Sequence, residues 1–217
     1  MQAVLRRSAL HHRLVAAGAR MRPARGWEQA ESFGDREAEV RNLHAGVVLA
    51  DLSAQHLLLA QADDLTGWLP STPRLGEVAL VANGGSPVRC CRLTDDSALF
   101  AGAVPPVLPP APDACGHVTD LTSGRTIVAV AGPRSLDLLR AATQVDLRER
   151  TMPDRRCLQT SVARVPAIVL RFDRSGVPAY EILVPRDLGE YLWDALLDAG
   201  APVGVRPVGA AALDRGD

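Results

Sequence analysis

A cluster of prolines near the middle of the chain limits the fold more than any other feature of the sequence. Residues 104–113 read VPPVLPPAPD, in which half of the positions are proline. Proline has no backbone N–H to donate, so this run can continue neither a helix nor the hydrogen-bond ladder of a central strand. The 217-residue chain is therefore predicted to consist of two halves of small-domain size, residues 1–103 and 117–217, joined by residues 104–116.

The two halves repeat one order of elements: a strand, a helix and then further strands. In the first half, His56–Ala60 is a predicted strand, and Asp63 or Asp64 can cap the helix that follows it. In the second half, Thr126–Val130 is a predicted strand, and Pro133 fits the first turn of the next helix, where its missing N–H is not needed. The further strands are expected at residues 77–82, 88–93, 98–101, 160–164, 167–172 and 179–184.

Helices are also predicted near both ends of the chain. Residues 9–17 are expected to form a helix that Gly18 ends, and a polar loop over residues 21–34 follows. Residues 187–199 carry an apolar stripe and stop at Gly200. Strands joined by hairpins, with helices packed on one side, predict an α+β fold made of two related, mainly antiparallel sheet-plus-helix subdomains.

Composition excludes several classes of function. A net charge of −1 argues against a nucleic-acid partner, which needs a basic excess. All 24 basic residues are arginine, so neither a Schiff-base lysine nor a P-loop lysine is possible. No apolar run reaches the roughly 18 residues of a membrane span. The four cysteines lack the spacing of a metal site, and free thiols are typical of a cytoplasmic protein.

The stretch PAYEILVP, residues 178–185, places a carboxylate inside a short strand between two prolines. Simple alternation would turn Tyr180 and Ile182 toward the core and Glu181 toward water. The alternative is that Glu181 is an acceptor held for a ligand. The residues of the strand leave both interpretations open.

Other polar or aromatic positions are weaker candidates. Residues 11–12 are two histidines on the first helix, and because neighbours on a helix point about 100° apart, one core-edge and one solvent position is favoured. Asp51 could be catalytic, but a structural carboxylate bonded to loop N–H groups is favoured. The aspartates at 95–96 are interpreted as turn residues. Trp27 either walls a pocket or fixes the predicted loop to the body.

Several short motifs, taken in order, resemble the glycine cleavage T-protein (aminomethyltransferase) family. Those near the N-terminus are residues 8–12 (SALHH), 18–21 (GARM), 26–28 (GWE), 39–41 (EVR) and 46–53 (GVVLADLS). Those in the second half are residues 130–133 (VAGP), 176–182 (GVPAYEI), 207–209 (PVG) and 212–214 (ALD). The resemblance covers nearly the whole chain, with a poor match in the middle of the first half.

The resemblance implies a tetrahydrofolate-binding unit in which Glu181 orients the pterin ring. A pterin edge presents two adjacent donors, and one carboxylate accepts both in parallel. Arg174 and Arg215 would then be candidates for stacking or for binding the folate tail, with Tyr180 and Trp27 packed around the site. The reaction that the family implies is transfer of a one-carbon unit between a small amine substrate and tetrahydrofolate.

In length, and in residues 157–160 (CLQT), the chain is also similar to the small gamma subunit of heterotetrameric sarcosine oxidase. The chain is expected to stop where the T-protein's C-terminal barrel-like domain would begin. This resemblance implies an alternative function, a non-catalytic gamma-type subunit that assembles with flavoprotein oxidase subunits.

The sequence departs from the family's pattern at several positions. The enzyme branch places an aspartate after a Gly-Gly turn, but residues 84–90 read GGSPVRC and contain no acid, so no catalytic residue is assigned. Arg174 stands where the family has an aromatic residue. Leu213 occupies the nearest match to the family's arginine, with Arg215 two positions later.

Overall fold

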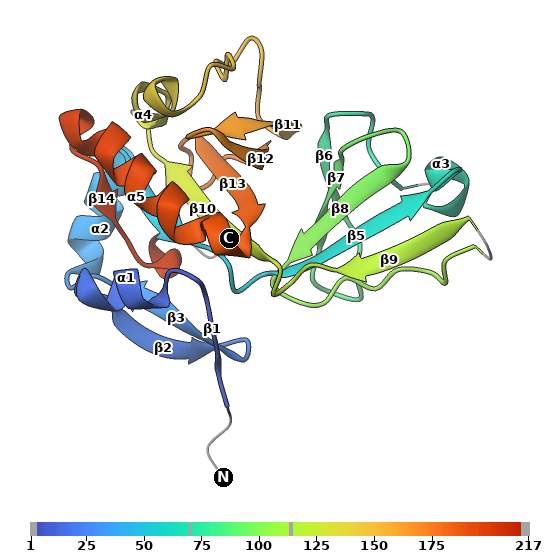
Figure 1. Cartoon of the computed structure of the whole chain (residues 1–217), viewed down its shortest axis with the longest axis horizontal. Coiled ribbons are helices and arrows are strands. Elements are labelled where there is room, and N and C mark those ends of the chain that lie inside the picture. Colours follow the sequence, from blue (N-terminus) through green and yellow to red (C-terminus); the bar gives the residue numbers. More distant parts are fainter. Residues whose placement is uncertain (1–3, 70, 113–114, 214–217) are drawn as a thin grey trace.

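The computed structural model describes residues 4–69, 71–112 and 115–213, which form three sheets and five α-helices (Figure 1). The largest sheet has six strands in the order β11-β12-β13-β10-β4-β14. These strands are β4 (Val48–Asp51), β10 (Arg125–Ala131), β11 (Arg156–Val162), β12 (Val165–Arg171), β13 (Ala179–Pro185) and β14 (Arg206–Pro207).

The second sheet has five strands in the order β6-β7-β8-β5-β9. These are β5 (His56–Ala62), β6 (Val78–Val81), β7 (Val88–Arg92), β8 (Ser97–Gly102) and β9 (Gly116–Asp120). A small third sheet consists of β1 (Arg6–Arg7), β2 (Arg20–Ala24) and β3 (Trp27–Ser32). Among the described residues, the β1–β3 and β14–β4 pairs are parallel and the remaining ladders are antiparallel, which confirms the predicted α+β class.

The helices are α1 (His11–Ala16), α2 (Arg36–Ala45), α3 (Leu65–Trp68), α4 (Ser135–Ala142) and α5 (Gly189–Gly200). Asp35 caps α2 by accepting a hydrogen bond from the backbone N–H of Glu37 at 2.9 Å, and Gly46 ends that helix. None of the helices in the described residues has the length and apolar composition of a membrane-spanning segment.

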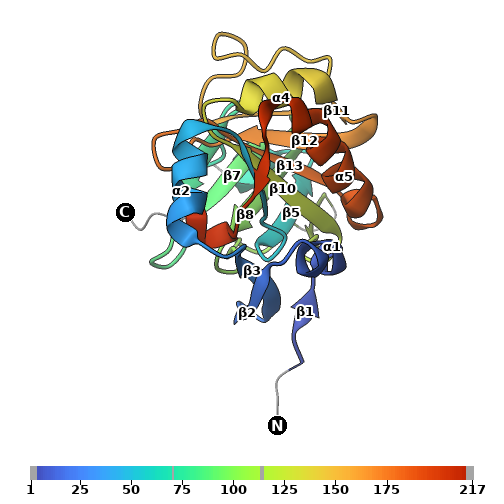
Figure 2. The same cartoon turned by 90° about the vertical axis from the view of Figure 1, so that its left-hand side faces the viewer.

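The two large sheets and the helices stack in layers. Leucines of α4 and α5 share a buried cluster with Val128, Val130, Tyr180 and Ile182, so these helices cover one face of the six-stranded sheet. Figure 2 shows α4 and α5 in front of β10 and β13, with β5, β7 and β8 behind them. The other face of the six-stranded sheet packs against the five-stranded sheet.

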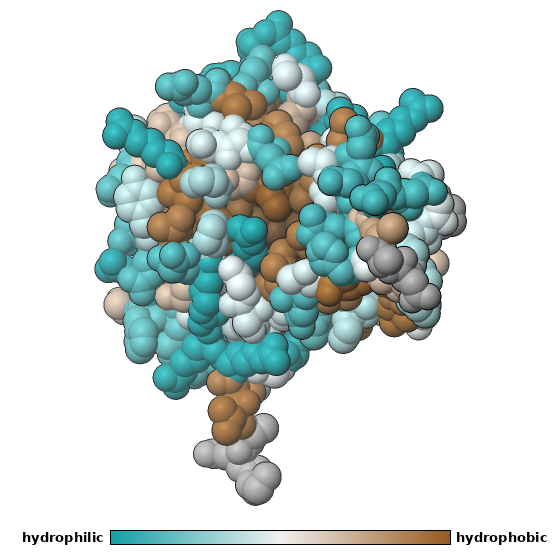
Figure 3. All heavy atoms as spheres, turned by 45° about the vertical axis from the view of Figure 1, so that its right-hand side comes forward, coloured by the Kyte–Doolittle hydropathy of each residue, from teal (hydrophilic) through white to brown (hydrophobic). Residues whose placement is uncertain are grey.

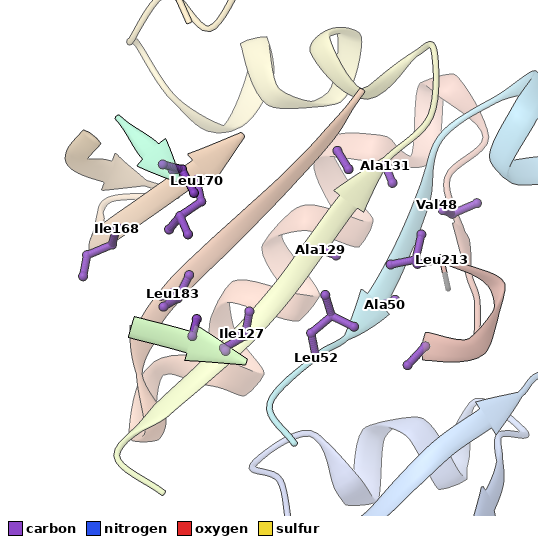
Figure 4. Packing of buried hydrophobic residues seen from close by; sticks show 14 of the residues in the cluster. Val48, Ala50, Leu52, Ile127, Ala129, Ala131, Ile168, Leu170, Leu183 and Leu213 are labelled. Carbon is purple, nitrogen blue, oxygen red and sulfur yellow. The ribbon is translucent and has the colours of Figure 1, made fainter. Parts of the chain in front are cut away.

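The core between the two sheets is built from the alternate residues of each strand. Figure 4 shows the contribution of the six-stranded sheet: residues of β4, β10, β12 and β13, together with Leu52 directly after β4, line one face, labelled Val48, Ala50, Leu52, Ile127, Ala129, Ala131, Ile168, Leu170 and Leu183. The five-stranded sheet adds Leu57, Cys91 and Leu99 to the same cluster. Because side chains alternate along a strand, every second residue of β13 points into this layer, whether it is apolar or polar.

The strand pairing cuts across the predicted division into residues 1–103, 104–116 and 117–217. β4, from the first half, pairs with β10, so the six-stranded sheet contains strands of both halves. β9, from the second half, pairs with β5 in the other sheet. The chain passes from the six-stranded to the five-stranded sheet between β4 and β5, and it returns between β9 and β10. The division into domains itself stays a prediction.

The polar loop predicted for residues 21–34 is wrong. This segment holds most of the β2–β3 hairpin, whose turn residues Arg25 and Gly26 have positive φ values of 52° and 77°. Two successive residues with positive φ are typical of the tight turns that match the twist of a hairpin. The helix predicted at residues 9–17 is confirmed in a shorter form. The predicted strands are confirmed as well, and their ends differ from the prediction by a few residues in either direction.

Candidate functional site

The centre of the layer between the sheets contains an ion cluster around Glu181. Glu181 lies on β13 between Ala179 and Leu183, which point into the same layer, and its exposed fraction is 1%. Arg89 lies on β7 two residues before Cys91, and it is also buried. The interpretation that Glu181 faces water is therefore wrong, because a second sheet covers this face of β13.

Two arginines bind one oxygen of the Glu181 carboxylate. Nη1 of Arg89 and Nη2 of Arg174 each donate a hydrogen bond to Oε1 at 2.6 Å. Nη2 of Arg89 also donates to the side-chain oxygen of Gln55. The Arg89 guanidinium carbon stands 5.5 Å from the ring centre of Phe172, within the range of a cation–π contact.

The two arginines keep Glu181 ionised. Burial by itself raises the pKa of this carboxyl, because a charge is costly in a low dielectric. The positive charges of Arg89 and Arg174, and their hydrogen bonds, outweigh burial and lower the pKa from 4.5 to about 2. The cluster is therefore a charged carboxylate held between guanidinium groups at neutral pH.

A small cavity of about 190 Å³ lies beside the cluster. Arg89 and Arg174 line it together with Gln55, Phe172 and Arg25, whereas Glu181 is not among the lining residues. A molecule that entered this cavity would therefore meet guanidinium and amide groups rather than the carboxylate.

The structure brings Arg174 to Glu181 but separates the other described candidates from it. Tyr180 is the neighbour of Glu181 on β13, so its side chain points to the opposite face of the sheet, where its hydroxyl donates to the carbonyl of Leu147 at 3.0 Å. The expectation that Tyr180 packs around the site is therefore wrong. Arg215 lies outside the described residues.

Trp27 is buried on β3 and does not line the cavity beside Glu181. The guanidinium carbon of Arg6 stands 5.8 Å from its ring centre, so this tryptophan links β1 to β3. Of the two roles considered for Trp27, attachment of its segment to the body fits these contacts, and the role as a wall of the site does not.

Arg89 is the site residue that sequence reasoning missed. It lies in residues 84–90, where an acidic residue was sought and not found. A usable signal was its parity: Arg89 and Cys91 share one face of a strand in which every residue is buried. An arginine on a buried face needs a carboxylate partner, and Glu181 is a buried carboxylate on a strand of the facing sheet.

The remaining polar candidates do not line the cavity beside Glu181. Asp51 is buried and accepts hydrogen bonds from the hydroxyl and backbone N–H of Ser53 and from the hydroxyl of Ser8, at 2.5 to 2.9 Å. This confirms the favoured role as a structural carboxylate. His11 is buried and His12 is exposed, as the helix geometry predicts. The aspartates at 95–96 lie in the turn between β7 and β8.

Comparison with known sequences gives aminomethyltransferases and also a subunit of sarcosine oxidase. The sequence model of the family described as the GCVT N-terminal domain matches residues 104–215. An aminomethyltransferase of Streptomyces avermitilis is 35% identical to this chain over 97 residues, which are 45% of this chain and 26% of that protein.

Two solved structures share the fold. The glycine cleavage system aminomethyltransferase T from Bartonella henselae superposes with a TM-score of 0.78 at 18% identity, over 97% of this chain and 61% of that one. A chain of the heterotetrameric sarcosine oxidase from Corynebacterium sp. U-96 superposes with a TM-score of 0.64 at 23% identity, over 91% of this chain and 96% of that one. The chain thus spans only part of the length of the aminomethyltransferases that it matches, 26% and 61% in these two cases.

Proposed function

The chain belongs to the GCVT N-terminal domain family, the folate-binding family of the aminomethyltransferases, and from this premise we propose that it is a non-catalytic, gamma-type subunit of a heteromeric, sarcosine-oxidase-like complex. In this proposal the folate site of the family is closed by the chain's own arginines. Glu181, the residue that would orient a pterin, forms an internal ion cluster instead.

The observation that carries the proposal is the pair of 2.6 Å hydrogen bonds from Arg89 and Arg174 to Oε1 of Glu181. A pterin would need this carboxylate as the acceptor of its two ring-edge donors. Binding in that way would break two buried, charge-assisted contacts, and breaking a buried ion pair costs about 3–5 kcal/mol. The arginines therefore compete with a pterin for the same acceptor.

The size of the neighbouring cavity supports a closed site. Its volume is about 190 Å³. Pockets that bind cofactors and drug-sized ligands usually measure about 300–1,000 Å³. A tetrahydrofolate molecule with its glutamyl tail would need the side chains around this cavity to move apart.

The charge at position 89 supports the absence of catalysis. The resemblance to the enzyme branch places an aspartate in the stretch that here reads GGSPVRC, and the charged residue of this stretch is Arg89. A guanidinium stays protonated at any physiological pH, so it cannot accept a proton from a substrate nitrogen. Arg89 therefore cannot act as the general base that an aspartate at this position would supply.

Two observations support a role as a subunit. The fold recurs in a chain of a heterotetrameric sarcosine oxidase, where it accounts for 96% of that chain. Figure 3 shows one face of the molecule on which apolar atoms gather centrally and hydrophilic side chains border them. An apolar centre with a polar rim is typical of a protein–protein interface.

A second candidate function is tetrahydrofolate binding, with transfer of a one-carbon unit between a small amine and the folate. The observation that favours it is the place of Glu181 in residues 176–182, which resemble the pterin-binding strand of the family, so that its carboxylate becomes an acceptor for a pterin if the two arginine side chains swing away. The two candidates differ in whether a reduced folate binds.

Calorimetric titration with 5-formyltetrahydrofolate, a stable reduced folate, separates them. We expect no heat of binding and no thermal shift with the wild-type protein. Binding with a dissociation constant below about 1 mM that is lost in Glu181→Gln, and kept in the exposed control Glu37→Gln, would instead establish the folate function.

Light scattering after co-expression with the neighbouring genes tests assembly. We expect a species several times heavier than the 23.1 kDa chain. A lone chain of that mass at micromolar concentration would contradict the subunit role, whatever the outcome of the folate titration.

A further inference from the structure

A second cavity lies on the outer face of the five-stranded sheet, which is the face opposite to that of Arg89. Its volume is about 240 Å³. Val88 and Phe100 form its floor on β7 and β8, Trp68 of α3 lines one side, and Leu108 of the proline-rich segment lines another. This side of the sheet has its own buried cluster, separate from the core around Glu181.

The α3 side of the cavity is fixed by a buried arginine. Nε of Arg92 donates to the carbonyl of Thr94 at 2.7 Å, and Nη1 donates to the hydroxyl of Thr72 at 3.1 Å. The same hydroxyl donates to the carbonyl of Leu69 at 2.9 Å. These bonds tie the backbone after α3 to the end of β7, while the partly exposed indole of Trp68 takes no part in them.

The opposite side is fixed by Asn83. Its side-chain amide donates to the carbonyl of Pro105 at 3.2 Å, and its side-chain oxygen accepts from the backbone N–H of Val107 at 2.7 Å. The proline-rich segment is thereby held against the β6–β7 hairpin, and its prolines restrict the backbone further. A cavity with both sides fixed loses little freedom when a ligand binds.

The cavity is lined by uncharged residues, and one of them, Trp68, carries an unsatisfied donor. Nε1–H of Trp68 is buried and has no hydrogen-bond acceptor within the described part of the chain. An indole N–H can only donate, and buried donors are paired in the great majority of cases. This N–H has almost no accessible surface where it stands, so a ligand in the cavity supplies the missing acceptor when the indole turns toward it.

We propose that this cavity binds a small neutral ligand, a ring-sized apolar molecule with one hydrogen-bond acceptor that pairs with Nε1–H of Trp68. The absence of charged lining residues selects a neutral molecule. The size fits a substituted single ring, since an apolar cavity of about 150 Å³ already holds benzene in an engineered lysozyme. The site is distinct from the ion cluster of Glu181, and the proposal does not depend on the subunit role.

Acetophenone and α-methylstyrene test the proposal as a matched pair of probes. The two molecules have nearly the same shape, but a carbonyl oxygen in the first is a methylene group in the second. NMR of the full chain resolves the indole N–H signals of its three tryptophans. We expect acetophenone to move the signal that disappears in Trp68→Phe, and we expect α-methylstyrene to bind more weakly.

Two variants make the test decisive. In Trp68→Phe, the preference for acetophenone over α-methylstyrene should fall about 3- to 10-fold, because the donor is lost while the ring remains. Ala82 is exposed at the rim, so Ala82→Trp should fold and should block both probes. Ala201→Trp, at an exposed position of the other layer, is the control that should bind as the wild type does.

Three results would overturn the proposal: no indole signal moves up to the solubility limit of acetophenone, the moving signal belongs to another tryptophan, or the preference is unchanged in Trp68→Phe. If Trp68→Phe does not fold, the Trp68 signal is assigned through its backbone connectivity, and undiminished binding to Ala82→Trp then refutes the site.

Discussion

Replacing Glu181 by glutamine removes the charge that holds the two sheets together at their centre and keeps the size of the side chain. The amide retains an acceptor oxygen, but Arg89 and Arg174 both lose their bond to a carboxylate. Because the cluster is buried, water cannot replace that charge. We therefore expect a large loss of stability from a substitution that changes no volume.

The size of the loss follows from the pKa of Glu181. The difference between the ordinary value of 4.5 and about 2 corresponds to about 3 kcal/mol, at about 1.4 kcal/mol for each pKa unit. The folded pKa lies below the unfolded one, so this stabilisation is complete above pH 4.5 and is lost as the pH falls from 4.5 toward 2. At pH 7, the free energy of unfolding of Glu181→Gln should therefore be about 3 kcal/mol lower than that of the wild type.

Urea denaturation followed by circular dichroism at pH 7, 4.5 and 3 measures both the loss and its pH dependence. The gap between wild type and Glu181→Gln should narrow by about 2 kcal/mol between pH 4.5 and pH 3. Glu37→Gln is the matched control, because Glu37 pairs with Arg41 at the surface with 90% of its side chain exposed. A loss at pH 7 no larger than in this control, or a gap that stays constant with pH, would refute the role of the buried cluster.

Other substitutions probe parts of the fold that the cluster does not touch. Asp51→Ala should lower the free energy of unfolding by about 2 kcal/mol in urea, because three hydrogen bonds lose their acceptor. Asp51→Asn should lose less than half of that at pH 7, because burial raises the pKa of Asp51 and a neutral amide avoids the buried charge. Gly132→Ala should cost about 3 kcal/mol in a thermal unfolding scan, since φ is +114° and the new Cβ would stand 2.4 Å from the carbonyl oxygen of Gly46. Tyr180→Phe should cost about 1 kcal/mol in urea, the net value of its hydrogen bond to Leu147.

Local pattern predicted the strands and helices of the second half well. Thr126–Val130 and the segment 179–184 are short apolar runs bounded by turn residues, and such runs are typical of buried strands. The hairpin of β2 and β3 was missed because RMRPA contains two arginines and a proline, and its strand character comes from pairing with β3. The β-propensity of a segment carries no information about the strand with which that segment will pair.

The centre of the site shows the same division more sharply. Alternation along β13 is a property of the sequence, and it correctly groups Glu181 with Ala179 and Leu183 on one face. Whether that face meets water or a second sheet depends on how the two sheets pack. The partner Arg89 is 92 positions away along the chain and on the other sheet.

The amino-acid sequence by itself determined the class of fold, the family and the short motifs, because these depend on neighbours a few residues apart. Only the tertiary structure decided that the charge of the carboxylate at 181 is balanced by two arginines of the same chain, since the electrostatic free energy of a buried charge is set by what lies around it in space. The same holds for the cavity beside Trp68, whose walls come from α3, the sheet and the proline-rich segment.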